Sequence, residues 1–424
     1  MKQYDYIIAG GGCAGLSLAY YLSQSALRSK RVLLIDAEKK EHNDRTWCFW
    51  EDQPATFEDI VAREWPALSF SDEKGERPAS LGSLRYKMIR GADFYRKVNA
   101  AIDSLPNFEF LQANITEMGD SASGAYVIAD GRRFEAGWAF NSLFRNDARN
   151  ENPQGHHFLL QHFVGWWIKC PEPVFDPGKA TLMDFRTPQY RSTRFLYVLP
   201  FSEREALVEH TVFSRQKLHP KSYERALESY ISDTLGVGSY SIKEVERGVI
   251  PMTDRPFPVT LGAHIINIGT AGGAVKPTTG YAFLNIQRQV KHIVAQLSAN
   301  GSPLLPPPAA RRFRFYDSIL LNILQHHGEE GKPIFSALFR RNGMLKILRF
   351  LKEETSVWEE ARIFASLPFI PFLMALVRVA LLPLWRKFLS LRSSTGKMPV
   401  PDIFFGLGKT PKTNSRAHIR GKTL

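Results

Sequence analysis

Cysteine is scarce in this sequence. The 424 residues include three cysteines, Cys13, Cys48 and Cys170, and no two of them form a C-x-x-C pair. A disulfide framework and a structural zinc site are therefore not indicated, and we expect no bound metal. This pattern excludes the small disulfide-stabilised secreted proteins and favours a reducing, cytoplasmic setting.

The sequence also has no recognisable signal peptide and no internal repeat. The apolar start YDYIIAGGGCAGL is broken by glycines and has no small-residue cleavage site, so it predicts a buried strand and turn. With 44% apolar and 12% aromatic residues, the chain can bury a large core. A disordered protein is excluded, and the length suits about two to three domains.

Basic residues outnumber acidic residues, giving a net charge of +13. Such a charge suits nucleic acid or an anionic membrane surface. Much of the excess lies in the last third, from RRFRF at 311–315 to the basic tail, where it alternates with long apolar runs. This distribution favours peripheral contact with the inner face of a membrane, and we expect no nucleic-acid partner.

One apolar stretch, residues 365–384, has about the length of a membrane span. It contains Pro368, Pro371, Pro383 and Arg378, which are unfavourable in a lipid-exposed helix that crosses the bilayer core. The sequence favours a helix that lies in the membrane interface. A spanning helix and a buried core helix remain alternatives.

A glycine-rich turn follows the N-terminal apolar segment. DYIIAG predicts a strand, residues 16–25 a helix, and RVLLID a second strand that ends in Asp36. The intervening GGGCAG fits G-x-G-x-x-G: Gly10 permits the tight turn, Gly12 the approach of a pyrophosphate, and Gly15 close helix packing. Asp36, about twenty residues further on, is expected to bind a ribose. The pattern predicts a βαβ dinucleotide-binding unit.

A second cluster of small residues, INIGTAGGAVKPTTGYAF, starts at Ile266. It predicts another turn before a helix, and it resembles the distal FAD motif of the para-hydroxybenzoate-hydroxylase-like flavoproteins. Those proteins carry Asp after the first glycine, whereas this chain has Thr270, whose hydroxyl would bind a ribityl oxygen more weakly. FAD is therefore the predicted cofactor, and the predicted contacts in this segment are Gly269, Thr270, Gly272, Gly273 and Gly280.

This resemblance implies an α/β fold. We expect a Rossmann-type FAD-binding domain, an inserted antiparallel β-sheet that binds substrate, and a C-terminal helical region that faces a membrane. The FAD-binding domain is predicted in three pieces, residues 1–46, about 85–150 and 247–300. The other predicted parts are the sheet at about 47–84 and 151–246, the helical region at 301–391, and a disordered basic tail at 392–424.

Several strings, in this order along the chain, resemble the lycopene cyclases of carotenoid biosynthesis. They are DRTWCFW at 44–50, QHFVGWWI at 161–168, ALVEHT at 206–211, ERGVIPMTD at 246–254, GTAGGAVKPTTGYAF at 269–283, FYDSILLNIL at 315–324 and IFSALF at 334–339. The resemblance covers most of the chain up to about residue 391.

The resemblance implies a reaction without net redox change. The linear ψ-end groups of lycopene, or of another linear carotene, are cyclised by protonation of the terminal double bond, attack of the neighbouring alkene, and loss of a ring proton. FAD is required in its reduced form, and NAD(P)H is the expected reductant. Bacterial lycopene beta-cyclisation is the implied activity, but the sequence leaves ring type, ring number and oligomeric state open.

Tryptophans cluster in two of the matching strings. Trp47, Trp50, Trp166 and Trp167 could offer aromatic faces to a carbocation, each worth roughly 0.5 to 2 kcal/mol, and a wall for a long polyene. We predict them as substrate-binding residues. The alternative is that they are ordinary core aromatics.

The predicted acid lies in the segment LVEHT at 207–211, which resembles the F-L-E-E-T motif of the family. Glu209 matches the functional glutamate of that motif, and His210 replaces its acidic neighbour. We predict Glu209 as the catalytic proton donor and His210 as an assisting base, although strand alternation points them to opposite faces. A salt-bridged Glu209 and a structural His210 are the alternatives. FLKEET at 350–355 mimics the motif but is interpreted as a solvated helix end.

Two other functions fit the same sequence. A flavin-dependent reductase or hydroxylase of a polyisoprenoid would consume NAD(P)H in proportion to product. A carotenoid-holding flavoprotein without activity would not need Glu209. The mass and absorption spectrum of a lycopene-containing extract would separate these alternatives.

Overall fold

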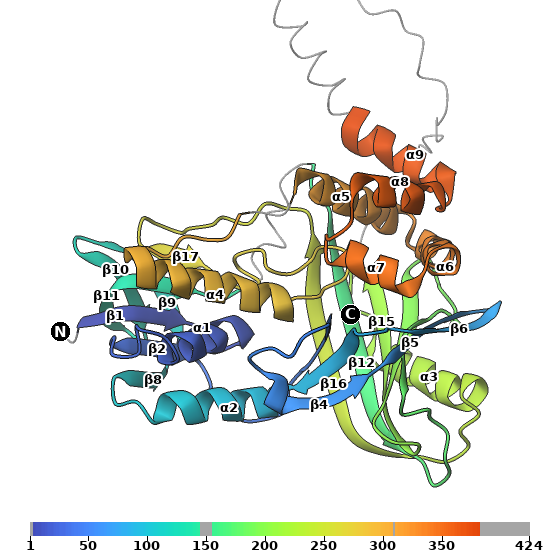
Figure 1. Cartoon of the computed structure of the whole chain (residues 1–424), viewed down its shortest axis with the longest axis horizontal. Coiled ribbons are helices and arrows are strands. Elements are labelled where there is room, and N and C mark those ends of the chain that lie inside the picture. The colour runs from blue at the N-terminus through green and yellow to red at the C-terminus, as the bar shows by residue number, and fades with distance from the viewer. Residues whose placement is uncertain (1–2, 145–154, 308–309, 382–424) are drawn as a thin grey trace, which may run out of the picture. The chain divides into compact units, whose positions relative to one another are not determined.

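The computed structural model describes residues 3–144, 155–307 and 310–381. The predicted disordered tail at 392–424 lies outside the described residues. Among the described residues, two seven-stranded sheets and one three-stranded sheet are covered by helices from different parts of the chain (Figure 1).

The first sheet contains the N-terminal βαβ unit that the glycine pattern predicts. Strands β1 (Gln3–Ala9) and β2 (Val32–Asp36) are parallel neighbours, joined by α1 (Cys13–Ser23). Parallel pairing continues to β8 (Phe108–Gln112) on one side and β11 (Arg132–Asn141) on the other. Strand β17 (Ile265–Asn267) also pairs with β11, which confirms that the chain returns to this sheet after residue 260.

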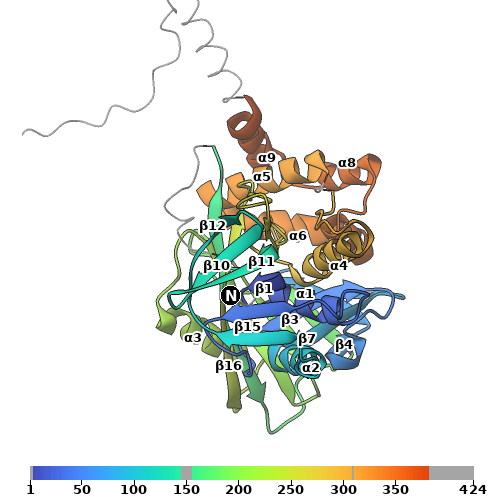
Figure 2. The ribbon, with the colours of Figure 1, turned by 90° about the vertical axis from the view of Figure 1, so that its left-hand side faces the viewer.

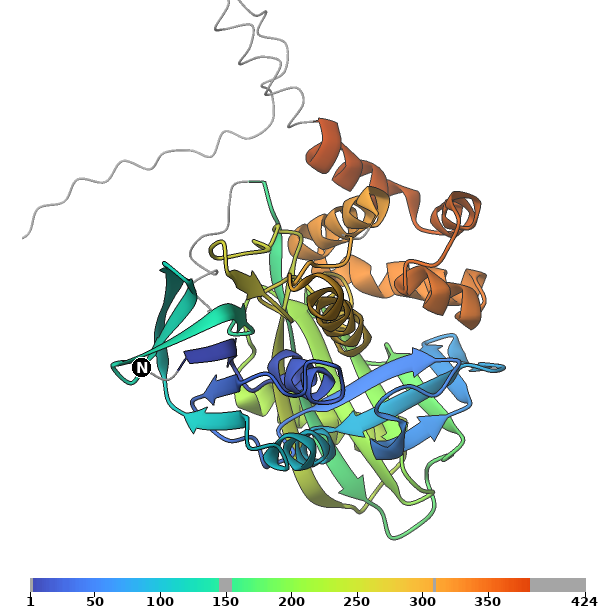
Figure 3. The same ribbon diagram turned by 60° about the vertical axis from the view of Figure 1, so that its left-hand side comes forward.

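Helices and an antiparallel β-meander, which supplies the last two of the seven strands, cover opposite faces of the parallel strands (Figure 3). Helices α1, α2 (Gly91–Asp103) and α4 (Phe283–Asn300) bury one face, where Ile8 and Leu34 lie among Leu18, Val98 and Val290. On the other face, Ile7 and Leu33 pack against β9 (Ile115–Ser121) and β10 (Gly124–Ala129). Strands buried on both faces explain the nearly continuous apolar runs in the sequence.

The second sheet is large and mostly antiparallel. Its order is β16-β12-β15-β14-β13-β5-β6, and only the β13·β5 pair is parallel. The strand bounds are β5 (Ala67–Asp72), β6 (Gly75–Ser80), β12 (Phe158–Lys169), β13 (Lys179–Asp184), β14 (Thr193–Pro200), β15 (Glu205–Ser214) and β16 (Ser241–Thr253).

Two strands lie in other sheets than their predicted ranges imply. Strand β16 stays in the large sheet as far as Thr253, so that sheet crosses the predicted boundary at residue 246. Strand β7 (Arg85–Arg90) begins the second predicted FAD-binding piece, but it pairs with β3 (Thr46–Glu51) and β4 (Val61–Trp65) in the three-stranded sheet. Composition did not reveal these boundaries because the segments on either side of both strands have a similar alternation of apolar and polar residues.

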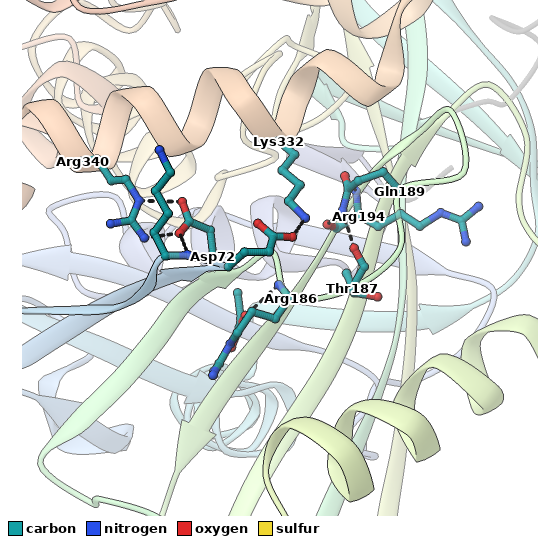
Figure 4. Close-up of polar contacts among 10 residues, drawn as sticks. Asp72, Arg186, Thr187, Gln189, Arg194, Lys332 and Arg340 are labelled. Atoms are coloured by element: carbon teal, nitrogen blue, oxygen red, sulfur yellow. Dashed lines mark hydrogen bonds and ion pairs between the residues drawn. The ribbon is translucent and has the colours of Figure 1, made fainter.

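The C-terminal helices except the last pack on one face of the large sheet, the last helix packs on the first of them, and α3 (Pro220–Ser229) packs on the opposite face of the sheet. The helices are α5 (Arg311–His326), α6 (Gly331–Arg341), α7 (Met344–Leu351), α8 (Val357–Ala365) and α9 (Phe369–Leu376). Figure 4 shows how α6 is fixed at the sheet edge: Arg340 binds Asp72 of β5, and Lys332 binds Glu73. Helices α8 and α9 lie on the side away from α2 (Figure 2).

Among the described helices, none alone is long and apolar enough to cross a membrane. Helix α8 and the helical segment that starts with α9 meet the length and composition criteria only together, and they are bent by 119° relative to each other. In the described part of residues 365–384, Phe369 is 72% exposed and Ile370 is 69% exposed, which does not agree with the buried-core alternative.

Candidate active site

A cavity of about 560 Å³ connects the glycine turn after β1 to the large sheet. Its walls come from α1, the three-stranded sheet, the second small-residue turn and strands β12, β14, β15 and β16. Among the predicted site residues, it is lined by Gly10, Gly12, Asp36, Trp47, Glu209, Thr270 and Gly280. The fold therefore brings the predicted cofactor residues and the predicted acid to one cavity.

The first glycine turn has the geometry that a bound pyrophosphate requires. Gly10 adopts φ +104°, a conformation that side chains disfavour. A Cβ on Gly15 would lie 1.9 Å from the carbonyl oxygen of Gly10, whereas a Cβ on Gly12 would meet nothing within 4 Å. Gly15 thus packs α1 on the turn, and Gly12 leaves open space at the N-terminus of α1, where backbone N–H groups attract anions. Asp36 contacts the same turn by accepting a hydrogen bond from the Gly11 N–H.

The second turn packs against the first. Gly269 has φ +61°, and a Cβ there would lie 2.5 Å from the Cβ of Ala14 in α1. A Cβ on Gly280 would lie 2.5 Å from the Oε1 of Gln161 in β12. Thr270 and Gly280 line the cavity, whereas the structure places Gly269, Gly272 and Gly273 behind the lining as turn and packing residues. The two turns together form a continuous cradle that fits an extended dinucleotide.

Glu209 lies near the middle of β15, between β12 and β14, and it lines the cavity. The Thr211 hydroxyl donates to its Oε1 at 2.7 Å. Burial, and then the negative charge of Glu246, raise the pKa of the Glu209 carboxyl to about 8, against the lowering effect of Thr211. Glu209 is therefore predominantly protonated at neutral pH, as a proton donor must be.

Glu246 lies in the same row of the sheet as Glu209. Gly165 of β12 pairs with Glu209 on one side and with Glu246 of β16 on the other, so all three residues share the cavity face. The Thr46 N–H and hydroxyl donate to the two oxygens of Glu246, at 2.8 and 2.6 Å. Glu246 opens the string ERGVIPMTD, but its partnership with Glu209 depends on strand register, which the sequence did not reveal.

Three tyrosines lie around Glu209 at the cavity wall, and they were not predicted as site residues. Tyr197 of β14 is the direct cross-strand neighbour of Glu209. The hydroxyl groups of Tyr86 in β7 and Tyr281 in the second turn form a hydrogen bond of 3.3 Å. All three tyrosines line the cavity. Burial raises the pKa of each phenol, so each stays neutral. The strings RYKMI, FLYVLP and TGYAF contain these residues, but nothing in them signals convergence.

His210 does not join Glu209 at the cavity. Because side chains alternate along β15, His210 points to the other face of the sheet, where it is fully buried beside Tyr223 of α3. Burial, with the positive charge of Arg194, lowers the pKa of His210 to about 3, so its ring is neutral. The structure thus separates the two predicted catalytic residues, and this position does not suit the assisting base.

The four predicted tryptophans have different surroundings. Trp47 lines the cavity and contacts Phe94, Tyr95 and Phe283. Trp50 is buried behind the lining, edge-on to Tyr281, and Trp166 is buried on the α3 face of the large sheet. Trp167 shares the face of Gly165 but stacks on Phe201, with Arg90 over its ring. Only Trp47 of the four is at the cavity wall.

The FLKEET segment is not a solvated helix end. Glu353 adopts φ +65° directly after α7, and its carboxylate accepts a hydrogen bond from the Lys276 Nζ at 2.9 Å. The same Nζ binds Asp317 of α5 at 3.1 Å. Lys276 belongs to the second glycine turn, so a largely buried ion cluster ties this turn to the C-terminal helices. The sequence interpretation missed the contact because its partners are 41 and 77 residues from Lys276.

Comparison with known families agrees with this arrangement. A family profile described as "Lycopene cyclase protein" matches residues 5–377. The chain belongs to the lycopene cyclase family. The match extends from β1 to the segment that follows α9, so it includes both glycine turns, Glu209 and Glu246.

Curated relatives of this lycopene cyclase family member come from bacteria and plants. A lycopene beta-cyclase of Paracoccus sp. is 28% identical over 389 residues, covering 87% of this chain and 95% of the relative. One of Pseudescherichia vulneris is 26% identical, with the same coverage. The neoxanthin synthase of Solanum tuberosum is 26% identical over 298 residues, and this chain covers 57% of its length. Relatives of this family member thus carry more than one activity in their names.

Solved structures with the same fold are flavoproteins. A variant of a flavin-dependent brominase superposes with a TM-score of 0.57 at 15% identity, covering 85% of this chain and 98% of its own. A flavoprotein/dehydrogenase from Cytophaga hutchinsonii has a TM-score of 0.56 at 13% identity, covering 92% and 100%. The lycopene cyclase family member therefore has the predicted α/β flavoprotein fold, with the inserted sheet and the C-terminal helices.

Proposed function

We propose that this protein cyclises the ψ-end groups of lycopene, or of another linear carotene, to β-rings, with FAD in its reduced form. The observation that carries the proposal is Glu209, whose carboxyl has a pKa of about 8 and lines the cavity that also reaches both glycine turns. Membership of the lycopene cyclase family and the bacterial relatives, which are named lycopene beta-cyclases, support the same function.

The first step is protonation of a weakly basic alkene. Glu209 donates its proton to the terminal double bond, the neighbouring alkene attacks the resulting tertiary cation and closes the ring, and a ring proton is then lost. One proton is gained and one is lost, so mass and oxidation state are unchanged. The apolar surroundings of Glu209 suit this step because they keep the carboxyl protonated until the alkene is in place.

The cavity lining also suits the cation. Tyr86, Tyr197, Tyr281 and Trp47 present aromatic rings, and each face offers a cation roughly 0.5 to 2 kcal/mol of stabilisation. These neutral phenols are weaker nucleophiles and weaker bases than carboxylates, so they quench the cation less readily than several carboxylates would. Glu209 as the acid and the aromatic rings as the cation-stabilising wall are the roles we propose.

We infer that FAD binds along the two glycine turns, with its pyrophosphate at Gly12 and its ribose at Asp36. Reduced flavin would supply negative charge to this cavity, and NAD(P)H is the proposed reductant. Replacing Gly12 with a bulky residue should remove the flavin, because its Cβ projects into the open space that a pyrophosphate needs. A full flavin complement in that variant would contradict the assignment.

The deciding test is anaerobic conversion of lycopene by purified protein with chemically reduced flavin. We expect a product of unchanged mass with a blue-shifted, less structured absorption spectrum. Consumption of NAD(P)H in proportion to product would instead indicate an oxidoreductase acting on a polyisoprenoid. Binding of carotene without conversion would indicate a carotenoid-holding protein.

We further propose that helices α8 and α9 dock the protein on the inner face of a membrane, where carotenes reside. Trp358 is 82% exposed on α8, and Phe369 and Ile370 are exposed on α9. Arg362 is exposed on α8 as well, and basic residues beside exposed apolar ones favour an anionic lipid surface.

Flotation with liposomes tests this docking surface. Ile370→Ser should weaken binding to anionic vesicles, because it removes an exposed apolar side chain from the proposed contact. Leu261→Ser is the matched control, since Leu261 is 52% exposed in the loop before β17. Equal loss of binding in both variants, or no binding by the unmodified protein, would contradict docking through these helices.

A further inference from the structure

Glu246 is a second carboxyl group on the cavity face of the large sheet, and the acid step assigned to Glu209 does not use it. It lies across Gly165 from Glu209 in one cross-strand row. Neighbouring strands are about 4.8 Å apart, so the two glutamate backbones are roughly 10 Å apart. This row places two acidic side chains on one face with no side chain between them.

Gly165 leaves the space between Glu209 and Glu246 free of a side chain. A Cβ at this position would lie 2.9 Å from Leu207 Cδ1 and 3.4 Å from the Cβ of Glu209. A larger residue would therefore crowd the acid and separate the two glutamates. The glycine keeps the middle of the row open.

The hydrogen bonds of the two glutamates differ. Burial raises the pKa of Glu246, and the hydrogen bonds that its two oxygens accept from Thr46, together with the nearby Arg45, oppose this rise. For Glu209, the Thr211 hydroxyl donates to one oxygen. The negative charge of Glu246 acts on the buried Glu209 carboxyl and raises its pKa, so Glu246 is the charged member of the pair.

The other titratable side chains that face Glu209 carry no negative charge that could take the place of the charge on Glu246. The titratable side chains that face Glu209 from β3, β7, β14 and the second turn are neutral at physiological pH, namely Cys48, Tyr86, Tyr197 and Tyr281. The charged groups near Glu246 are Asp44 and Arg45, and Lys40 and Arg247 also line the cavity.

We propose that Glu246 is a positioning residue: ionised, it holds a fixed negative charge across Gly165 from Glu209, and it fastens the segment Arg45–Trp47 at the cavity wall. A like charge at this distance opposes ionisation of Glu209 and so keeps the acid protonated. Through its two hydrogen bonds, Glu246 holds Thr46 in place. Thr46 directly precedes Trp47, the one predicted tryptophan that lines the cavity. The effect of Glu246 on cyclisation rests on the proposed function, whereas its effect on the Glu209 midpoint does not.

The test measures Glu209 directly, by infrared titration of the purified flavin-loaded protein. The band of the protonated carboxyl is assigned by its absence from Glu209→Gln. In Glu246→Gln, which keeps the shape and one acceptor oxygen, the midpoint should move to lower pH by about one unit, since the neighbouring charge is gone. The basic limb of the cyclisation rate should move with it.

Glu244→Gln is the matched control. Glu244 lies two residues earlier in β16, is exposed, and pairs with Arg90 at 2.7 Å, so its loss should leave the Glu209 midpoint in place. Thr46→Val removes one hydrogen bond to Glu246 but keeps its charge, so it should also retain the high midpoint. Glu246→Asp keeps a negative charge, so its Glu209 midpoint should lie between those of Glu246→Gln and the unmodified protein.

An unchanged midpoint in Glu246→Gln would overturn the proposal, as would an equal shift in Glu244→Gln. If Glu246→Gln does not fold, Glu246→Ala removes the same charge, and a midpoint in that variant equal to that of the unmodified protein would overturn the proposal instead. Failure of the proposed function is a separate outcome, because it would appear as absence of cyclisation by the unmodified protein whatever the titration shows.

Discussion

The two faces of strand β15 show how one segment can serve two purposes. Glu209 and His210 are sequence neighbours and both are buried, but burial moves their pKa values in opposite directions, to about 8 and about 3. Each shift favours the neutral form, because low-polarity surroundings disfavour charge on either group. Glu209 faces a cavity where its proton can be transferred, whereas His210 faces the packed core under α3.

A perturbed pKa identifies a functional candidate only together with access to a ligand. Both ring nitrogens of His210 have no hydrogen-bond partner among the described residues. Glu209 lines about 560 Å³ of space and has a charged partner across Gly165. The cavity face should therefore control the reaction, and the α3 face should control stability.

The largest effect is expected from Glu209→Gln. This change keeps the shape of the side chain but removes the acidic proton, and general acid catalysis is typically worth about 10²- to 10⁴-fold. We expect the variant to fold and bind flavin but to lose nearly all cyclisation in single-turnover measurements with reduced flavin. A rate within about tenfold of the unmodified protein would lie below that range and contradict the role of the acid.

The pH dependence should follow the same carboxyl group. Its proton is bound below a pKa of about 8 and is lost as the pH rises through that value, so the single-turnover rate should fall on the alkaline side. Each further pH unit should lower the rate about tenfold, since the protonated fraction falls in that proportion. A rate that stays constant well above pH 8 would show that another group donates the proton.

A smaller effect is expected from the tryptophans, and it should differ between the two faces. Trp47→Leu removes an aromatic face from the cavity, so the rate should fall by about 2- to 30-fold, which corresponds to roughly 0.5 to 2 kcal/mol. Trp166→Leu leaves the cavity wall intact but disturbs the packed core, so thermal unfolding should shift while the rate of folded protein is retained. Equal rates for the two variants would remove the distinction between the faces.

The smallest effect is expected from His210→Leu. The imidazole is neutral and has no hydrogen-bond partner in the described part of the chain, so an apolar side chain of similar size should change the free energy of unfolding by less than about 1 kcal/mol. Cyclisation should stay close to that of the unmodified protein. A large loss of activity with normal folding and flavin content would show that His210 acts on the reaction through the sheet.

The local sequence determined much of the nucleotide-binding half. The G-x-G-x-x-G spacing, the strand before it and Asp36 after it are all within 36 residues of the N-terminus, and local steric rules fix such a turn. Alternation along β15 likewise determined that Glu209 and His210 point to opposite faces. The order of matching strings indicated the family.

Only the tertiary structure decided which residues meet at the acid. The register of β12 places Glu246 and Glu209 on either side of Gly165. Tyr86, Tyr197 and Tyr281 come to the cavity from three separate elements. The sequence offers Trp47, Trp50 and Trp166 as similar candidates for the cavity wall. The packing of their strands places Trp47 at the wall and buries Trp50 and Trp166 away from it. Contacts between residues far apart in the chain depend on how sheets pair and pack, and local patterns do not encode that pairing.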